Sequence, residues 1–242
     1  MRIIRAKDYD HMSRQAANII SAQVILKPDS VLGLATGASP IGTYQQLIKW
    51  FRKGDVDLGQ VRTVNLDEYV GLAPVDPQSY YCFMRRNFFD NVNIYPANTN
   101  IPYGLNLNAE DECSRYDETI QRLGGIDLQL LGLGPNGHIG FNEPADYFTK
   151  GTHRVTLSEA TVQANKRFFE KEEDVPRYAY TMGICDIMQA KRVVMVVSGK
   201  AKAEIVKKAF FGPVTPWCPA SILQLHTDFT LVADEEALSE LP

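Results

Sequence analysis

The sequence predicts an α/β protein: one Rossmann-like domain with a mostly parallel sheet and helices on both faces. Two observations predict this class. Short apolar runs without polar alternation recur along the chain, and amphipathic segments separate them. The 242 residues are enough for one sizeable α/β domain and few for two. We therefore expect residues 1–242 to form a single domain.

Five apolar runs are predicted to be strands buried on both faces of the sheet. They are Ser30–Ala35, Val61–Leu66, Asp127–Leu131, Arg192–Val197 and, with a weaker pattern, Phe229–Ala233. Ligands of such sheets sit beyond the carboxyl ends of the strands. Polar residues that directly follow these runs are therefore candidates for a functional site.

Helical signals occupy the segments between the strands. Ser39 and Pro40 predict a cap and a first-turn proline for a helix that continues to Phe51 and ends at Gly54. Further helices are predicted at Gln78–Phe89, Ala109–Leu123 and Lys200–Phe210. The stretch from about residue 144 to 177 is polar and charged and shows little sheet signal. We expect it to be an excursion that serves as an active-site lid.

Composition and charge exclude several classes of protein. Hydrophobic residues make up 45% of the chain and charged residues 22%, as in ordinary globular proteins. A formal net charge of −4 provides no basic field for nucleic acid or an anionic membrane, so an anionic ligand needs a local site. No apolar run is long enough for a signal peptide or a membrane span. The four cysteines are scattered without a CxxC pair, which predicts reduced thiols in a cytoplasmic protein and no metal site.

The segment LGLATGASPIGTY predicts a phosphate site between a strand and a helix. Thr36, Gly37, Ala38 and Ser39 offer backbone N–H groups and two hydroxyls at a helix start. The segment matches neither GxxxxGK[ST] nor GxGxxG, so nucleotide binding is not indicated. A tight strand-to-helix turn with a serine cap explains the same residues, and the segment alone does not separate the two interpretations.

Acid–base chemistry is indicated by two further segments that follow strands. In NLDEYVGL, Asp67 and Glu68 point to opposite sides of an extended chain, and Asp67 is the better candidate to face a pocket. In LLGLGPNGHIGFNEP, His138 lies in a glycine-rich loop, and Glu143 is placed to orient its imidazole. The sequence contains neither a GxSxG nucleophile elbow nor an HExxH motif. Acyl-enzyme hydrolysis and zinc proteolysis are therefore not indicated.

Six segments in this order resemble the glucosamine-6-phosphate deaminase family over nearly the whole chain. They are TGASP, NLDEYVGL, SYYCFMRRNFFD, GPNGHIGFNEP, RFF and GKAKAE. The resemblance implies a Rossmann-like fold and an isomerising deamination that needs no metal or organic cofactor. The implied products of glucosamine 6-phosphate are fructose 6-phosphate and ammonia.

The resemblance also implies the roles of particular residues. His138, with Glu143 as its partner, would open the sugar ring, and Asp67 would move a proton between C2 and C1. The residues implied to hold the phosphate are Thr36, Gly37, Ala38, Ser39, Arg167 and Lys202. Taken singly, Arg167 and Lys202 are equally explained as solvated surface charges.

Two departures from the better-known long members of the family affect the expectations. Those members carry Asp where this chain has Asn136, which can still accept a hydrogen bond from the imidazole. The segment ADYFTKGTHRVT lacks the serines and basic residues of their allosteric site, and the longer tail is missing. We therefore expect no allosteric activation, and a monomer or small homo-oligomer rather than a hexamer.

Two other functions compete with the deaminase interpretation. A 6-phosphogluconolactonase would share the phosphate loop and the histidine but would need no base at C2. A non-catalytic sugar-phosphate sensor would keep the loop and lose the acid–base residues. The presence of Asp67, His138 and Glu143 together favours the enzyme.

Overall fold

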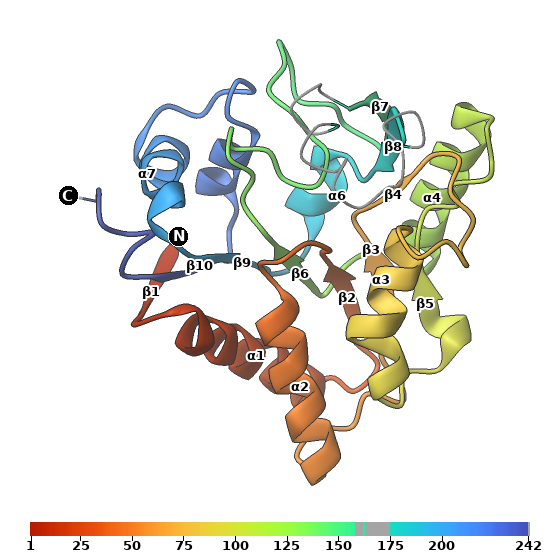
Figure 1. Ribbon diagram of the computed structural model, residues 1–242, viewed down its shortest axis with the longest axis horizontal. Helices are drawn as coiled ribbons and strands as arrows, with labels where there is room; N and C mark the ends of the chain where they lie inside the picture. The colour runs from red at the N-terminus through yellow and green to blue at the C-terminus, as the bar shows by residue number, and fades with distance from the viewer. Residues whose placement is uncertain (158–161, 163–174, 242) are drawn as a thin grey trace.

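The computed structural model describes residues 1–157, 162 and 175–241, and two sheets organise this part of the chain (Figure 1). The strands are β1 (Arg2–Ala6), β2 (Val31–Leu34), β3 (Arg62–Asn65), β4 (Asp67–Tyr69), β5 (Thr99–Asn100), β6 (Leu128–Leu131), β7 (His153–Thr156), β8 (Tyr178–Thr181), β9 (Val193–Val197) and β10 (Phe229–Asp234). The α-helices are α1 (Tyr9–Leu26), α2 (Ile41–Lys53), α3 (Tyr80–Asn87), α4 (Ala109–Arg122), α6 (Ile184–Gln189) and α7 (Ala203–Phe211). The α/β class predicted from the sequence is confirmed.

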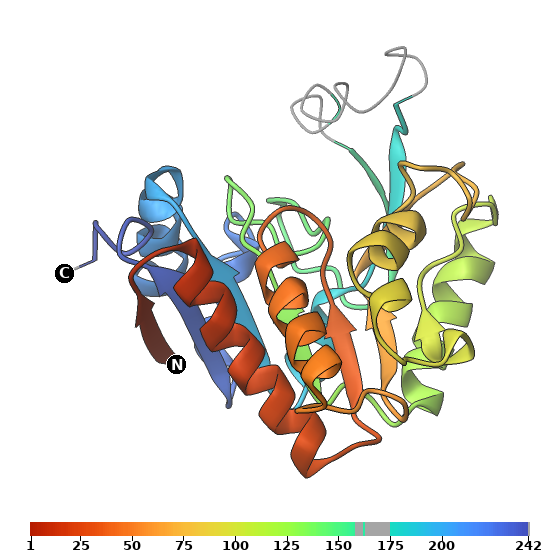
Figure 2. The ribbon, with the colours of Figure 1, turned by 60° about the horizontal axis from the view of Figure 1, so that its bottom comes forward.

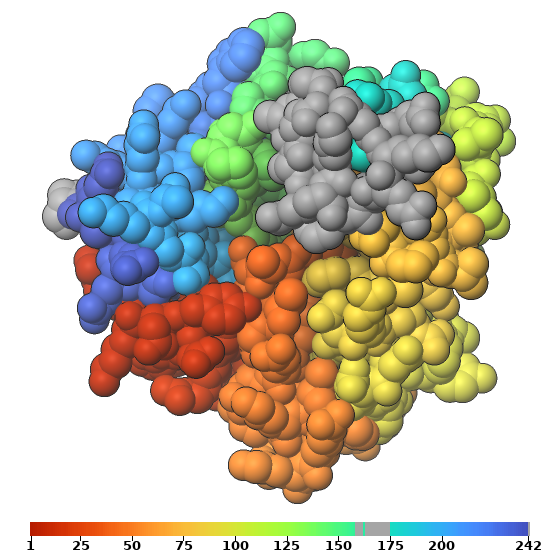
Figure 3. Space-filling view, viewed as in Figure 1, coloured from red at the N-terminus to blue at the C-terminus, as the bar shows by residue number. Residues whose placement is uncertain are grey.

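The main sheet has seven strands in the order β1-β10-β9-β6-β2-β3-β5, and every pairing in it is parallel. All five predicted strands are present in this sheet. The N-terminal strand β1 pairs with β10 near the other end of the chain, which brings the two terminal segments side by side (Figure 1 and Figure 3). Because every strand has the same direction, all their carboxyl ends lie along one edge of the sheet.

Both faces of the sheet are buried, which explains the continuous apolar runs. In β9, Val193, Met195 and Val197 belong to one core cluster, whereas Val194 and Val196 belong to the other. Helices α1, α2 and α3 cover the face of the second cluster, and α4, α6 and α7 cover the opposite face (Figure 2). Alternate side chains of each strand thus pack against different helical layers, as a doubly covered parallel sheet requires.

The helix ends predicted from the sequence are confirmed in part. Gly54 ends α2 in the left-handed conformation with φ of 81°, as predicted. The predicted cap at Ser39 is wrong: Pro40 occupies the cap position, no side chain caps the helix, and α2 begins at Ile41. The strand-to-helix loop is therefore one residue longer than expected. Two other predicted helices begin or end in short 3-10 turns, at Phe89–Asn91 after α3 and at Lys200–Lys202 before α7.

A second, antiparallel sheet was not predicted. It contains β4, β8 and β7, which have three, four and four residues. The expectation of little sheet structure between residues 144 and 177 is wrong in one part, because β7 lies in this stretch and pairs with β8. Of the stretch expected to serve as a lid, residues 158–161 and 163–174 lie outside the described residues. Within the described parts, no helix is long and apolar enough to cross a membrane.

The buried carboxylate of Asp127 ties the amino-terminal edges of the sheet strands together. It accepts a hydrogen bond of 2.8 Å from the Val31 N–H and pairs with Lys191 at 2.8 Å and Lys27 at 3.0 Å. The Asp127 side chain is 5% exposed, whereas that of Asp29, which also pairs with Lys27, is 59% exposed.

We expect Asp127→Ala to lower the free energy of unfolding by about 1–3 kcal/mol, because the Val31 N–H loses its buried partner. Urea denaturation monitored by circular dichroism measures this change. Asp29→Ala is the matched control, and we expect a much smaller effect because its ion pair is solvated. Equal losses of unfolding free energy in Asp127→Ala and Asp29→Ala would contradict the stabilising role assigned to Asp127.

Candidate active site

A polar pocket of about 260 Å³ opens at the carboxyl edge of the main sheet. Segments that follow β2, β3, β6 and β9 contribute to it, and the loops after β2 and β6 lie side by side above the sheet (Figure 2). The pocket is lined by Ala35, Thr36, Gly37, Ala38, Ser39, Leu66, Asp67, Tyr80, Gly132, Leu133, Gly134, Pro135, His138, Gly140, Phe141 and Lys202. The parallel sheet therefore brings together most of the residues singled out in the sequence.

The loop after β2 presents backbone donors to this pocket. In the described part of the chain, no acceptor takes a hydrogen bond from the N–H groups of residues 36–39. Gly37 has φ of 86°, a left-handed conformation that favours glycine. The Tyr9 hydroxyl, on α1, holds the loop by donating to the Ala38 carbonyl at 2.9 Å and accepting from the Gly42 N–H at 2.8 Å. Such a loop at a helix start is suited to an anion.

Lys202 supplies a positive charge to the same end of the pocket. Its Nζ donates to the Leu133 carbonyl at 2.7 Å, which leaves further N–H donors for a ligand. Burial lowers the pKa of Lys202, and a bound anion would offset that effect. The second predicted cation, Arg167, lies outside the described residues.

Asp67 and Glu68 point to opposite sides of β4, as the alternation of an extended chain predicts. Asp67 lines the pocket, whereas Glu68 lines a separate cavity behind the strand. Within the described residues, the Asp67 carboxylate accepts no hydrogen bond although its residue is only 5% exposed. Burial, and then the nearby charge of Glu68, raise the pKa of Asp67 to about 8. A carboxylate of raised pKa is a stronger base, and it lies in the site without a competing partner.

Two side chains of its own loop orient the His138 ring from its Nδ1 side. Its Nδ1 lies 2.7 Å from the Asn136 Oδ1, and the Asn136 amide donates to the Glu143 carboxylate. An amide oxygen only accepts, so in this arrangement Nδ1 carries a proton and Nε2 is the free ring nitrogen. Glu143 Oε1 itself is 3.4 Å from Nδ1. Asn136 therefore links Glu143 to the imidazole.

Hydrogen bonds to β8 place the His138 loop next to Asp67. Thr181, which pairs with Asp67 in the small sheet, accepts from the Phe141 N–H at 3.0 Å through its hydroxyl. The Asn142 amide donates to the Met182 carbonyl at 2.8 Å. Gly140 has φ of 58°, and a Cβ there would lie 3.3 Å from the Asp67 Oδ2 and 3.0 Å from the Thr181 hydroxyl. Glycine at this position lets the backbone approach the carboxylate.

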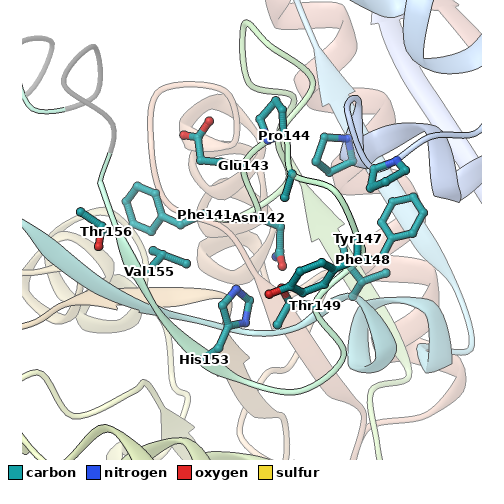
Figure 4. A pocket seen from close by; sticks show the side chains of 14 residues that line it. Phe141, Asn142, Glu143, Pro144, Tyr147, Phe148, Thr149, His153, Val155 and Thr156 are labelled. Carbon is teal, nitrogen blue, oxygen red and sulfur yellow. The ribbon is translucent and has the colours of Figure 1, made fainter.

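A second cavity of about 250 Å³ lies behind the same loop (Figure 4). Phe141, Pro144, Tyr147 and Phe148 form much of its wall, and the His153 ring points into it (Figure 4). Burial lowers the pKa of His153, which favours the neutral imidazole. Among the described residues of its wall, His153 is the one basic side chain, and Glu143 adds a carboxylate. This cavity offers little to a phosphate.

Sequence reasoning missed three residues that shape the pocket. Tyr80 lines it from α3, Tyr9 holds the loop after β2, and Gly140 allows the approach to Asp67. The two tyrosines are distant in sequence from the loops they support, and only the segment SYYCFMRRNFFD drew attention to one of them. No cluster of three or more His, Cys, Asp or Glu residues suited to a metal ion occurs in the described ranges.

The fold and the pocket define a class of protein: a Rossmann-like α/β enzyme in which a loop suited to an anion lies in one pocket with Asp67 and His138 at the carboxyl edge of the sheet. Comparison with known proteins narrows the class. Residues 7–232 match the family model described as glucosamine-6-phosphate isomerases/6-phosphogluconolactonase, so the chain belongs to this family.

Individual relatives cover nearly all of the chain. A glucosamine-6-phosphate deaminase of Lachnoclostridium phytofermentans is 60% identical over 96% of this chain and 98% of its own length. One from Halothermothrix orenii is 51% identical over 100% of both chains. A solved structure described as a monomeric glucosamine-6-phosphate deaminase has 46% identity and a TM-score of 0.95, with 99% of each chain covered. The 6-phosphogluconolactonase of Trypanosoma brucei, at 17% identity and a TM-score of 0.76 over 100% of this chain and 98% of its own, shares the fold alone.

The raised pKa of Asp67 predicts a pH-dependent gain in stability for Asp67→Asn. The folded protein binds a proton at Asp67 up to about pH 8, whereas in the unfolded chain the Asp67 carboxyl has its ordinary pKa of 3.8 and releases the proton there. This group therefore lowers wild-type stability as pH rises between those values. We expect the stability advantage of Asp67→Asn to be larger at pH 8.5 than at pH 5, by at least about 1 kcal/mol.

Urea denaturation at the two pH values measures this difference. Asp228→Asn, which neutralises a half-exposed carboxylate that pairs with Arg192 on the surface, is the control and should show no such pH-dependent gain. A constant difference between Asp67→Asn and wild type at both pH values would show that Asp67 ionises normally.

Proposed function

We propose that this protein catalyses the isomerising deamination of glucosamine 6-phosphate to fructose 6-phosphate and ammonia. The observation that carries the proposal is the placement of Asp67 and His138 in one pocket with an anion-binding loop and Lys202. The relatives named above, which share this chain over nearly its full length, bear the name of that activity. Proposal and geometry therefore agree on a small sugar phosphate as the substrate.

The phosphate would bind at the loop formed by Thr36, Gly37, Ala38 and Ser39, with Lys202 beside it and Arg167 as a further proposed ligand. Backbone donors and a cation hold this distant group, and its binding energy orients C1 and C2 over the acid–base residues. Burial of Lys202 strengthens its attraction for the anion, because the pocket screens charge less than water does.

Ring opening would be carried by His138. Its free Nε2 takes the proton of the anomeric hydroxyl and returns a proton to the ring oxygen, so that the ring C–O bond breaks and an open aldehyde forms. Asn136 and Glu143 hold the other nitrogen and stabilise the imidazole when it is charged. No proton is gained or lost in this step.

Asp67 would then transfer a proton from C2 to C1. Abstraction at C2, with protonation of the aldehyde oxygen, gives an enolamine. Return of the C2 proton to C1, with loss of one proton from the nitrogen, gives the ketose imine, so the proton that O1 gains balances the proton that the nitrogen releases. Water adds to the C2 imine, and ammonia leaves to yield fructose 6-phosphate. General-base catalysis of this kind contributes about 10²- to 10⁴-fold, and the pKa of Asp67, raised to about 8, suits the task.

We further propose that the enzyme acts as a monomer or small homo-oligomer without an allosteric activator. A solved relative with a TM-score of 0.95 is described as monomeric. The segment after Pro144 contributes Tyr147, Phe148 and Val155 to the cavity of Figure 4, where a sugar phosphate finds few donors. We also propose that the stretch of about 144–177 closes over the pocket, since it adjoins Glu143.

The test is the release of ammonia and fructose 6-phosphate from glucosamine 6-phosphate by the purified protein. We expect equal amounts of both products, a hyperbolic substrate curve that N-acetylglucosamine 6-phosphate leaves unchanged, and at least about a 10²-fold loss in Asp67→Asn because the base is removed. Asp228→Asn should retain full activity, since it lies in a surface ion pair with Arg192.

Two other outcomes would replace the proposal. Turnover of 6-phosphogluconolactone, with none of glucosamine 6-phosphate, would establish the lactonase. Binding of glucosamine 6-phosphate without turnover of either compound would indicate the sensor.

Asn136→Asp is expected to shift the pH–rate profile of the enzyme. A carboxylate in place of the amide, 2.7 Å from Nδ1, adds a negative charge that stabilises the protonated imidazole. The pH dependence of kcat/KM, measured across pH 5–9, should therefore differ from that of the wild type. Asn18→Asp, an exposed change on α1, controls for net charge. Superimposable profiles for the wild type and Asn136→Asp would show that this position does not tune His138.

A further inference from the structure

Glu68 is a buried carboxylate that the proposed chemistry does not use. It directly follows Asp67 in β4 but lines a different cavity, of about 620 Å³, on the far side of the strand. Its residue is 3% exposed. A buried acidic side chain that cannot reach the substrate needs another explanation for its place beside the proposed base.

The Glu68 carboxylate connects β4 to the beginning of α3. Its Oε1 accepts from the Tyr69 N–H at 2.8 Å and the Tyr80 N–H at 2.9 Å, and its Oε2 accepts from the Tyr81 N–H at 2.9 Å. Tyr80 and Tyr81 are the first two residues of α3, where helical N–H groups have no partner within the helix. Negative charge at this end of a helix is favourable. One side chain thus fixes the helix start to the strand that carries Asp67.

Tyr80 extends this connection into the substrate pocket. Its side chain lines the pocket next to Asp67, and its hydroxyl donates to the Tyr69 hydroxyl at 3.1 Å. The Tyr80 ring lies parallel to that of Phe141, with centroids 6.0 Å apart and an interplanar angle of 7°. Tyr80 and Phe141 therefore form an aromatic wall beside the base. A shift of the first turn of α3 would move this wall.

We propose that Glu68 is a positioning residue: from the far side of β4 it holds Tyr80 against Asp67 and so fixes the geometry of proton transfer. This inference rests on the proposed function, because it assigns Asp67 as the base. Glu68 touches no substrate. It acts through the three backbone N–H groups that it binds and through its charge next to Asp67.

The charge of Glu68 affects the pKa of Asp67, and this effect can be measured separately from any effect of Glu68 on stability. It helps to raise the pKa of Asp67, and burial together with hydrogen bonding sets its own pKa at about 7. Within the described residues, the other titratable and charged groups near these two carboxylates are Tyr69, Asp76, Tyr80, Tyr81, Glu112, Arg115, Tyr116, His138 and Lys202. None of them changes in the variants below. Removal of the Glu68 charge should therefore lower the pKa of Asp67.

The test compares Glu68→Gln with Ser79→Ala. An amide keeps the shape of the carboxylate but has one acceptor oxygen, so at least one of the three N–H bonds is lost together with the charge. Ser79 caps the same helix by accepting from the Cys82 N–H at 3.0 Å, and Ser79→Ala weakens α3 without changing a charge. Both variants should have a lower Tm.

We expect Glu68→Gln to lower kcat about 10- to 100-fold with a much smaller change in KM, because the phosphate loop is untouched. The acidic limb of its kcat/KM profile should move to lower pH, whereas that of Ser79→Ala should remain in place. An unchanged kcat in Glu68→Gln, or limbs that move equally in both variants, would overturn the proposal. If Glu68→Gln does not fold, Glu68→Asp decides: its charge is kept but its reach is shorter, so wild-type kcat there overturns the proposal as well.

A carboxyl ¹³C NMR titration separates this inference from the proposed function. The pKa of Asp67 can be followed without substrate in the wild type and in Glu68→Gln. A wild type that does not turn over glucosamine 6-phosphate refutes the function and the positioning role in that reaction, while a lower Asp67 pKa in the variant still confirms the coupling. An active wild type with the same Asp67 pKa in both proteins refutes the inference alone.

Discussion

The parallel direction of all seven strands in the main sheet is the constraint on which the site depends. Helices bury both faces of this sheet, so a polar side chain placed on either face loses its contact with water, which is unfavourable. The carboxyl edge is the place where several strands can deliver polar residues to one point. The loop of residues 36–39 after β2, Asp67 after β3, the His138 loop after β6 and Lys202 after β9 all meet there.

The small antiparallel sheet adds what the main sheet cannot provide. Asp67 begins β4, whose pairing with β8 closes off the carboxylate from water and sets it beside the Thr181 hydroxyl that holds the His138 loop. Burial without a hydrogen-bond partner is unfavourable for a carboxylate, and the fold sustains it by packing Tyr80 and Phe141 around it. The raised pKa of Asp67 and its cost to stability thus have one physical origin, because its charged form is poorly solvated.

The Asn136 amide makes hydrogen bonds to both His138 and Glu143. Its oxygen accepts from the imidazole while its amino group donates to Glu143, so both halves of the side chain are used. The connection orients His138 without placing a second negative charge beside Glu143. Asp67 and His138 therefore differ in their surroundings: the Asp67 carboxylate is buried and accepts no hydrogen bond within the described residues, whereas His138 is partly exposed and is held by Asn136 and Glu143.

The sequence by itself determined the fold class and the five central strands, because these follow from local periodicity. It also indicated the pocket residues Thr36, Gly37, Ala38, Ser39, Asp67, His138 and Lys202, since each follows a recognisable strand or begins a helix, but it did not indicate Tyr80 or Gly140. Tertiary structure decided the rest. The strands β4 (DEY), β7 (HRVT) and β8 (YAYT) contain no continuous apolar run that would predict them, and they form because they pair with one another. The support of the loops by Tyr9 and of α3 by Glu68, and the pKa of Asp67, depend on contacts and burial that separate segments create only when the chain is folded.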